Sequence, residues 1–347
     1  MQETVDVLLA TYNGEKYIRE QIESILNQTY KNIRLIISDD CSKDNTPEIL
    51  KEYEKNDNRV ELYIQEENLG VVKNIEFLLG KVKDKYYMLS DQDDVWLPEK
   101  IEKSLETLIN KNVDLVFGDL EVVDQDLKTM YPSFGDFMLL NKKINKYINS
   151  TKLNYIYNCV TGCTVLAKKE TIQKILPLPE RSKYLIHDHW IGLMVSIYGK
   201  VAYMPEKYIK YRQHGNNQVG TEKISHGFRK LDQVRELFIN VKLGVFGTYV
   251  ENNDRFPESM QKLNVEIYDY FKMIQDRIVR FISSHSKVSE DELEKMMMNT
   301  GILTKDLGTI LVGQEAVDKG LVNGVGGIKE AFAKMQELMN EKGKEHD

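Results

Sequence analysis

The feature that most constrains the fold is a regular alternation of apolar runs and helical patterns over about the first 120 of the 347 residues. Runs rich in Val, Ile and Leu predict buried strands at 5–10, 33–38, 60–64, 86–89 and 113–117. Apolar residues at helical spacing predict helices over 17–28, from 46 onward, over 71–79 and from 98 to about 110. Strands that alternate with helices in this way predict βαβ units and an α/β fold with a mostly parallel sheet.

Composition excludes several classes of protein. Hydrophobic residues make up 41% of the chain and charged residues 29%, which supports a folded core and excludes global disorder. The net charge of -7 argues against a nucleic-acid binder, because phosphate neutralisation needs a basic surface. Cys41, Cys159 and Cys163 are too few for a disulfide framework. Cys159 and Cys163 lie four positions apart, and we interpret them as buried thiols rather than a zinc site.

The sequence also bears on location. Its first residues show no secretory signal pattern, and no apolar stretch reaches the ~18 residues needed to span a bilayer. We therefore expect a cytoplasmic protein, and the composition leaves open a peripheral attachment to the inner face of the cell membrane.

Polar clusters follow three of the predicted strands. They lie at 11–14, 39–44 and 91–94. Ligands of parallel α/β sheets bind beyond the carboxyl ends of the strands, so the three clusters should meet at one edge. A single cluster of this kind would be interpreted as a solvated loop or a helix cap. Three at one edge predict a binding site.

The cluster after the fourth strand contains an Asp-x-Asp element, Asp91-Gln92-Asp93. Carboxylates two residues apart at a strand end can share a hard divalent cation that keeps substrate phosphates among its ligands. The alternative is a helix N-terminus at which Asp93 or Asp94 complements the helix dipole.

The second half of the chain has a looser pattern. We expect a mobile polar loop at 124–150, a strand at 161–167, a helix at 188–199 opened by the cluster 187–190, and short strands at 201–204 and 208–211. A polar turn at 212–217 follows, and the pattern from 223 onward is mostly helical.

Several motifs, in this order, resemble family 2 glycosyltransferases between about residues 4 and 220. They are VLLATYNG at 7–14, QIESILNQTY at 21–30, IISDDCS at 36–42, NLGV at 68–71 and SDQDDVW at 90–96. The resemblance implies a GT-A fold, a nucleotide-sugar donor and inversion at the anomeric carbon. The elements DQDD at 91–94, HDHW at 187–190 and YRQHGNN at 211–217 are most similar to the rhamnosyltransferase-like branch that builds bacterial surface polysaccharides.

The resemblance implies a set of nucleotide-binding residues: Ala10, Thr11, Tyr12, Asp39, Asp40, Asn68, Gly70, Asn74, Asp91 and Gln92. The chemistry agrees, because a tyrosine ring can stack on a base and a carboxylate can accept hydrogen bonds from base N–H or ribose hydroxyl groups. For Tyr12 the alternative is a packed aromatic ring, and for Gly70 a structural turn.

The metal site implied by the resemblance consists of Asp93 as direct ligand, with Asp91 at the ribose or the metal. His214 would complete the metal or diphosphate site, and the alternative is an ordinary surface histidine. The expected ion is Mn²⁺ or Mg²⁺.

Asp188 matches the family's catalytic acidic residue and would remove the proton from the acceptor hydroxyl. Many members have Glu-Asp here, whereas this chain has His187-Asp188; the alternative role is a helix N-cap. The side chains expected around the sugar and acceptor are Trp96, His187, His189 and Trp190, although buried packing explains each tryptophan equally well.

The tail resembles a different family. ILTKDLGT at 302–309, GQEAVDKGLV at 313–322 and GGIKEA at 326–331 are similar to the C-terminal part of Clp-protease-like serine peptidases. No Gly-x-Ser-x-Gly element precedes the tail, so it would lack the nucleophile. We expect a GT-A domain at 1–225, with a nucleotide half to about 120, then a helical extension at 226–267 and a non-catalytic tail at 268–347.

These features predict a metal-dependent inverting glycosyltransferase. It would move a sugar, with rhamnose the first choice, from a dTDP- or UDP-linked donor to a glycan or lipid-linked acceptor. The alternative is a catalytically silent sugar-nucleotide-binding or scaffolding protein whose tail drives assembly, including homo-oligomerisation. A dinucleotide-dependent oxidoreductase is disfavoured because the first strand-helix turn lacks Gly-x-Gly-x-x-Gly.

Overall fold

The computed structural model describes residues 3–137, 158, 160–179, 186–214, 248–285 and 289. Contacts divide the chain into two compact units, 1–220 and 221–347. The boundaries predicted at 225 and 268 stay predictions.

The first unit is built on a nine-stranded sheet with the order β3-β2-β1-β4-β8-β6-β9-β5, in which β7 pairs with β6. Its first half, up to β4, alternates strands and helices as predicted. The elements are β1 (Val5–Thr11), α1 (Ile18–Leu26), β2 (Ile33–Asp39), α2 (Thr46–Asn56), β3 (Val60–Ile64), α3 (Val71–Leu79) and β4 (Tyr86–Ser90). These four strands are parallel, so the βαβ prediction is confirmed here.

The other half makes the sheet mixed. It contains β5 (Val95–Trp96), α4 (Lys100–Asn110), β6 (Leu115–Val123), β7 (Thr129–Tyr131), α5 (Phe134–Phe137), β8 (Leu166–Lys168), α7 (Ile172–Ile175), α8 (His187–Tyr198) and β9 (Val201–Arg212). Strand β8 runs antiparallel to both β4 and β6, β9 is parallel to β6, and β5 is antiparallel to β9. The sheet is therefore parallel around β1 and mixed beyond β4.

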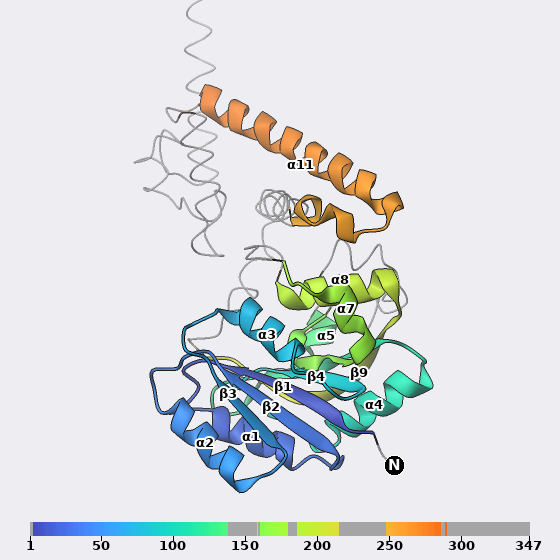
Figure 1. Ribbon diagram of the computed structural model, residues 1–347. Helices are drawn as coiled ribbons and strands as arrows, with labels where there is room; N and C mark the ends of the chain where they lie inside the picture. Colours follow the sequence, from blue (N-terminus) through green and yellow to red (C-terminus); the bar gives the residue numbers. More distant parts are fainter. Residues whose placement is uncertain are drawn as a thin grey trace, which may run out of the picture. The chain divides into compact units, whose positions relative to one another are not determined.

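Helices cover both faces of this sheet. Figure 1 shows α1, α2 and α4 on one face and α3, α7 and α8 on the other. Side chains alternate along each strand, so Val7 and Leu9 of β1 join the core under α1 and α4, whereas Leu8 points to the opposite face. Because both faces are covered, the strands read as continuous apolar runs rather than as alternating patterns.

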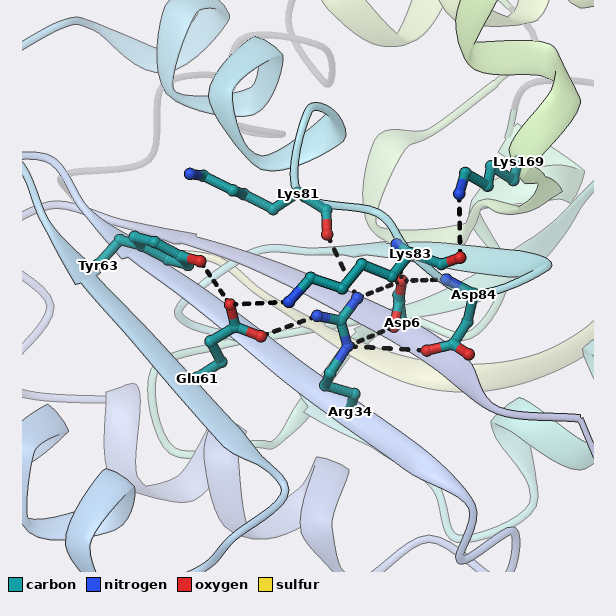
Figure 2. A network of polar contacts seen from close by, with 8 residues as sticks. All are labelled: Asp6, Arg34, Glu61, Tyr63, Lys81, Lys83, Asp84 and Lys169. Carbon is teal, nitrogen blue, oxygen red and sulfur yellow. Dashed lines mark hydrogen bonds and ion pairs between the residues drawn. The ribbon is translucent and has the colours of Figure 1, made fainter.

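A network of charged side chains lies toward the amino ends of β1 and β2 (Figure 2). Asp6, with none of its surface exposed, accepts hydrogen bonds from Arg34 Nε at 2.9 Å and Nη2 at 2.7 Å. The same carboxylate accepts the backbone N–H groups of Lys83 at 2.8 Å and Asp84 at 3.0 Å. Glu61 of β3 accepts from Arg34 Nη1 at 2.8 Å, so one guanidinium joins three adjacent parts of the sheet.

Three predictions about the second half are wrong. Residues 162–164 form a 3₁₀ turn, and only 166–168 pair as a strand, because Thr164 N and Val165 N bond back to Thr161 and Gly162. The segments predicted at 201–204 and 208–211 form one strand, since a register shift against β6 lets exposed residues 205–207 bulge. The predicted loop at 124–150 holds β7 and α5 in its first part, and the rest lies outside the described residues.

The described part of the second unit contains a 3₁₀ turn, Asn253–Arg255, and α11 (Glu258–His285). Tyr249 and Phe256 are buried and their ring centroids lie 5.4 Å apart. The peptidase-like motifs of the tail, from 302 on, lie outside the described residues. Within the residues that the structure describes, no helix combines the length and apolar character that crossing a membrane requires.

Candidate active site at the carboxyl edge of the sheet

The three polar clusters do meet at the carboxyl ends of the parallel strands. Thr11, which ends β1, is in register with Asp39, which ends β2. The backbone N–H of Asp40 donates to Thr11 O at 2.9 Å and continues this pairing into the loop. The third cluster follows Ser90, the last residue of β4, which neighbours β1 on its other side.

Gln92 joins the third cluster to the first. Its Oε1 accepts the Thr11 hydroxyl at 2.6 Å and the Tyr12 N–H at 2.8 Å, and its Nε2 donates to Tyr12 O at 3.2 Å. The Tyr12 side chain is 44% exposed, so it is not a packed core ring. Gly14 allows the approach, because a Cβ there would lie 2.6 Å from Gln92 Oε1.

Asp40 organises the loop that was predicted to close the nucleotide pocket. Its Oδ1 accepts the N–H of Leu69 at 2.6 Å and its Oδ2 accepts the N–H of Gly70 at 2.9 Å. Asn68 Nδ2 donates to Asp40 O at 3.0 Å. Gly70 has a φ of +80° and precedes α3, which is a conformation that favours glycine. The carboxylate of Asp40 is thus committed to shaping the loop.

Asp39 and Asn74 lie beneath this loop. Asp39 is fully buried and accepts the hydroxyl of Ser42 at 2.5 Å and its N–H at 3.0 Å; burial raises the pKa of Asp39 and these bonds oppose the rise. Asn74 is 2% exposed and donates to Ser38 O at 3.1 Å. Among the residues that the structure describes, its buried Oδ1 has no hydrogen-bond partner, which is the state of an acceptor that could receive a ligand N–H group.

Asp93 and His214 are brought together across 121 positions of the chain. His214 Nε2 lies 2.9 Å from Asp93 Oδ2, and the two side chains are 13% and 14% exposed. An octahedral ion with ligand distances of about 2.0–2.1 Å places adjacent ligands about 3 Å apart, so this spacing fits a shared divalent cation. Carboxylate oxygen and imidazole nitrogen are ligands that Mn²⁺ accepts.

Asp91 is half-buried and lies beside two buried side chains. Carboxylate atoms of Asp91 and Asp94 and the thiol of Cys163 all lie within 4.8 Å of one another. Burial, together with the charges of Asp93 and Asp188, raises the pKa of Asp91 to about 7. Asp91 is therefore within electrostatic reach of the candidate metal ligand and of the candidate base.

Lys100 lies behind this layer and was missed by the sequence analysis. Its side chain is 2% exposed, and its Nζ lies 3.2 Å from the centroid of the Trp96 ring. No residue within the described ranges forms a hydrogen bond with that nitrogen. Burial lowers the pKa of Lys100 to about 7, against the opposing effect of Cys163, Asp94 and Asp91. Its position near the start of α4 gave no signal in sequence, because a lysine there is usually solvated.

Asp188, in the first turn of α8, is 8% exposed. Its Oδ1 accepts His189 N–H at 2.6 Å and Asn158 Nδ2 at 3.1 Å, and its Oδ2 accepts Gly162 N–H at 3.3 Å. Burial raises the pKa of Asp188, which makes its carboxylate a better proton acceptor than a solvated one. Asn158 and Gly162 were not predicted as part of the site, since nothing in their spacing links them to Asp188.

The residues predicted around the acceptor divide into two groups. His187 flanks Asp188 and is half-buried, and burial lowers its pKa, which favours the neutral ring; His189 is 6% exposed. Trp96 and Trp190 are 2% and 0% exposed, and Trp190 Nε1 donates to Ile175 O at 3.0 Å. The structure thus places both indole rings in the interior, where they support the site from behind.

Comparisons with known proteins agree with this arrangement. The family model described as glycosyl transferase family 2 matches residues 6–176. A Haemophilus influenzae protein named as an uncharacterized glycosyltransferase is 31% identical over 61% of this chain and 66% of its own length. The chain thus spans just under two thirds of that relative. The dTDP-rhamnosyl transferase RfbG of Shigella flexneri is 30% identical over 65% of this chain and 79% of its own.

Among solved structures, S. aureus TarS 1-349 in complex with UDP-GlcNAc has a TM-score of 0.54 at 15% identity. The match covers 77% of this chain and 71% of TarS, and it shows the shared GT-A fold. The order of motifs along the chain, the parallel half-sheet with its polar carboxyl edge and the sequence identity to relatives all agree. The chain therefore belongs to glycosyl transferase family 2.

Proposed function

We propose that this protein is an inverting, metal-dependent glycosyltransferase of cell-surface polysaccharide synthesis. The observation that carries the proposal is that His214 lies against Asp93, while Asp188 accepts the N–H of Gly162, the residue before the Cys163 that lies beside Asp91. Such a set matches what transfer from a nucleotide sugar needs: groups for a diphosphate-bound cation and, nearby, a carboxylate to accept a proton. A dTDP-linked donor is supported by the similarity to RfbG, and a UDP-linked donor by the fold shared with TarS.

In this proposal the exposed ring of Tyr12 and the buried Asp39 and Asn74 hold the nucleoside. The loop that Asp40 fixes closes over it. Asp93 and His214 would hold the cation, Mn²⁺ or Mg²⁺, with Asp91 behind them. When bound, that ion supplies positive charge against the leaving nucleoside diphosphate.

Asp188 acts on the acceptor, a glycan or lipid-linked hydroxyl. The acceptor oxygen forms a bond to the anomeric carbon while the bond from that carbon to the diphosphate oxygen breaks. The proton of the hydroxyl passes to the Asp188 carboxylate, and the leaving diphosphate keeps the electron pair. The three hydrogen bonds to Asp188 fix its direction, and its raised pKa favours proton uptake.

The test is the release of nucleoside diphosphate from a panel of donors headed by dTDP-rhamnose and UDP-GlcNAc, with Mn²⁺ or Mg²⁺ and with excess EDTA. We expect Asp188→Asn to lower kcat by about 10²–10⁴-fold, the usual contribution of a general base. The matched control is Asp114→Asn. Asp114 is half-buried, accepts hydrogen bonds from Lys168 Nζ and Lys200 N, and lies at the amino end of β6.

Each part of the proposal can fail separately. Full turnover in excess EDTA would refute the claim that the enzyme needs a metal. Wild-type turnover by Asp188→Asn would refute the assignment of Asp188 as the general base. Tight donor binding with no transfer to any acceptor favours the alternative of a silent sugar-nucleotide-binding protein.

A further inference from the structure

Arg212, the last residue of β9, has a buried guanidinium at the centre of the site. Its side chain is 3% exposed. Nε donates to Asp93 O at 2.8 Å, Nη1 donates to Gln125 O at 2.7 Å, and Nη2 is paired with Glu20 of α1. One side chain thus ties together α1, the segment after β6 and the segment after β4.

The backbone of Arg212 holds the same segment from a second direction. Its N–H donates to Asp94 Oδ1 at 3.1 Å, and the next residue, Gln213, donates its N–H to Val123 O at 2.8 Å. The side chain and the backbone of one residue therefore bind both members of the Asp93-Asp94 pair. His214 follows two positions later, and its Nε2 reaches Asp93 Oδ2 at 2.9 Å.

Tyr17 supports both Arg212 and His214. The guanidinium carbon lies 4.5 Å from the centroid of the Tyr17 ring, and the imidazole centroid of His214 lies 4.9 Å from it. The buried Tyr17 hydroxyl has no hydrogen-bond partner in the described part of the chain, and the ring makes these contacts.

The charge of Arg212 by itself would work against a cation held at Asp93, because like charges repel. Its partner Glu20 offsets that charge, and the planar guanidinium is what provides donors in fixed directions. The contribution of Arg212 is therefore geometric. Residues that hold metal ligands in place act in this way, and losing one typically weakens metal affinity by about 10–100-fold.

We propose that Arg212 is a positioning residue that presets the spacing of Asp93 and His214 for a divalent cation, with the Tyr17 ring as its support. This inference rests on the proposed function, since it concerns the metal ligands of the same site. Arg212 touches neither donor nor acceptor in this assignment, so its loss should be felt as weaker metal binding rather than as a slower step at saturating metal.

The experiment measures Mn²⁺ binding directly, from the signal of free Mn²⁺ in electron paramagnetic resonance, with the full-length protein and no substrate. Arg212→Lys keeps the charge and loses the fork of donors. Arg34→Lys is the matched control, because Arg34 is a comparably paired arginine in the Asp6 network. A second pair is Tyr17→Leu, which removes the ring, and Tyr17→Phe, which keeps it. Unfolding midpoints are recorded for all variants.

We expect the Kd for Mn²⁺ to rise about 10–100-fold in Arg212→Lys and to stay within about twofold of wild type in Arg34→Lys. Tyr17→Phe should match wild type and Tyr17→Leu should bind Mn²⁺ more weakly. If turnover is measured, excess Mn²⁺ should restore kcat in Arg212→Lys, which a loss of folded protein would not allow.

Two results overturn the inference. One is an unchanged Kd in Arg212→Lys while wild type binds Mn²⁺, which leaves the proposed function standing. The other is a wild-type protein that binds no Mn²⁺. In that case the proposed glycosyltransferase activity is tested by measuring the release of nucleoside diphosphate without added metal. A wild type that binds Mn²⁺ but transfers no sugar refutes the function, and the affinities of the variants still decide the role of Arg212.

Discussion

Replacing Asp6 by Asn tests whether the buried network of Figure 2 stabilises the first unit. Asp6 Oδ2 accepts from Arg34 Nη2 and from two backbone N–H groups, and Oδ1 accepts from Arg34 Nε. An Asn side chain can keep its carbonyl on one side, but its NH₂ group must then face a donor. The variant loses a charge-assisted hydrogen bond and leaves Arg34 with a weaker partner.

The expected cost is about 3 kcal/mol at pH 7, taken from roughly 1.5–3 kcal/mol for a hydrogen bond to a charged group and 3–5 kcal/mol for breaking a buried pair. The low end of the second range applies, because Arg34 is 18% exposed and keeps Glu61. For a unit of about 220 residues this loss lowers the melting temperature by roughly 6–12 °C.

Tryptophan fluorescence is a suitable probe of this transition. The chain has 2 tryptophans, Trp96 and Trp190, and both are buried in the first unit, so the signal reports that unit alone. The control is Asp57→Asn. Asp57 makes the same two-pronged contact with Arg59, at 3.0 and 2.7 Å, but its side chain is 23% exposed, and we expect a cost below about 1 kcal/mol.

The pH dependence gives a second check. Burial raises the pKa of Asp6, but Arg34 and the N–H groups of Asp84 and Lys83 outweigh it and hold that pKa below its usual value. A carboxyl with a lowered folded-state pKa stabilises above its unfolded pKa and loses that contribution as pH falls through the folded pKa. The difference between wild type and Asp6→Asn should therefore be full at pH 7 and shrink in acid below about pH 4. The reasoning would be refuted if Asp6→Asn lost no more unfolding free energy than Asp57→Asn. It would also be refuted if the loss in Asp6→Asn stayed the same below about pH 4.

Three further substitutions test the surroundings of the site. Lys100→Met should raise the melting temperature at pH 7, because burial lowers the pKa of Lys100 to about 7 and makes its charged form costly in the folded state. This gain in melting temperature should shrink toward pH 10, where the lysine of the unfolded chain also loses its proton. A gain that is the same at pH 7 and pH 10 would contradict this explanation. Gly14→Ala should raise the KM for the donor about fivefold to tenfold, which corresponds to one lost hydrogen bond, because the added Cβ would displace the Gln92 side chain. Steady-state kinetics at a fixed metal concentration measures this KM. An unchanged KM would argue against a role for the position of Gln92 in donor binding. Gly70→Ala should cost about 1–3 kcal/mol in chemical denaturation from backbone strain alone, because a φ of +80° with a ψ of 157° is essentially restricted to glycine and no atom of the described residues lies within 4 Å of the added Cβ; a loss below this range would contradict this cause.

The elements that the sequence predicted best are those whose pattern is local. The helix predicted over 71–79 has the same bounds as α3, and the five predicted strands begin within two residues of β1, β2, β3, β4 and β6. Buried parallel strands are continuous apolar runs that end at polar residues, so their ends can be read directly. Prediction failed at 162–164, where local backbone hydrogen bonds form a 3₁₀ turn, and at 205–207, where pairing with the distant strand β6 joins two predicted strands into one.

The candidate site shows the same limit. Sequence alone indicated which polar side chains follow the strands, because the carboxyl ends of parallel neighbours must share an edge. The resemblance predicted that His214 would join Asp93 at the metal site, and the two side chains do meet. The sequence could not indicate that Asp91 would lie with Asp94 and Cys163, or that Asn158 would hold Asp188. These contacts depend on the direction in which each side chain leaves its loop.

The sequence by itself therefore determined the family, the alternating architecture from β1 to β4 and the residue types available for chemistry. Only the tertiary structure decided which side chains touch: Asp91 lies with Asp94 and Cys163, and Asn158 holds Asp188. The expected pair Asp93 and His214, 121 positions apart, meets because β9 runs parallel to β6 and ends in Arg212. The apolar periodicity of strands and helices is a local property that can be recognised directly in the sequence. The pairing of distant strands is set by the packing of the whole sheet, and the geometry of the site follows from it.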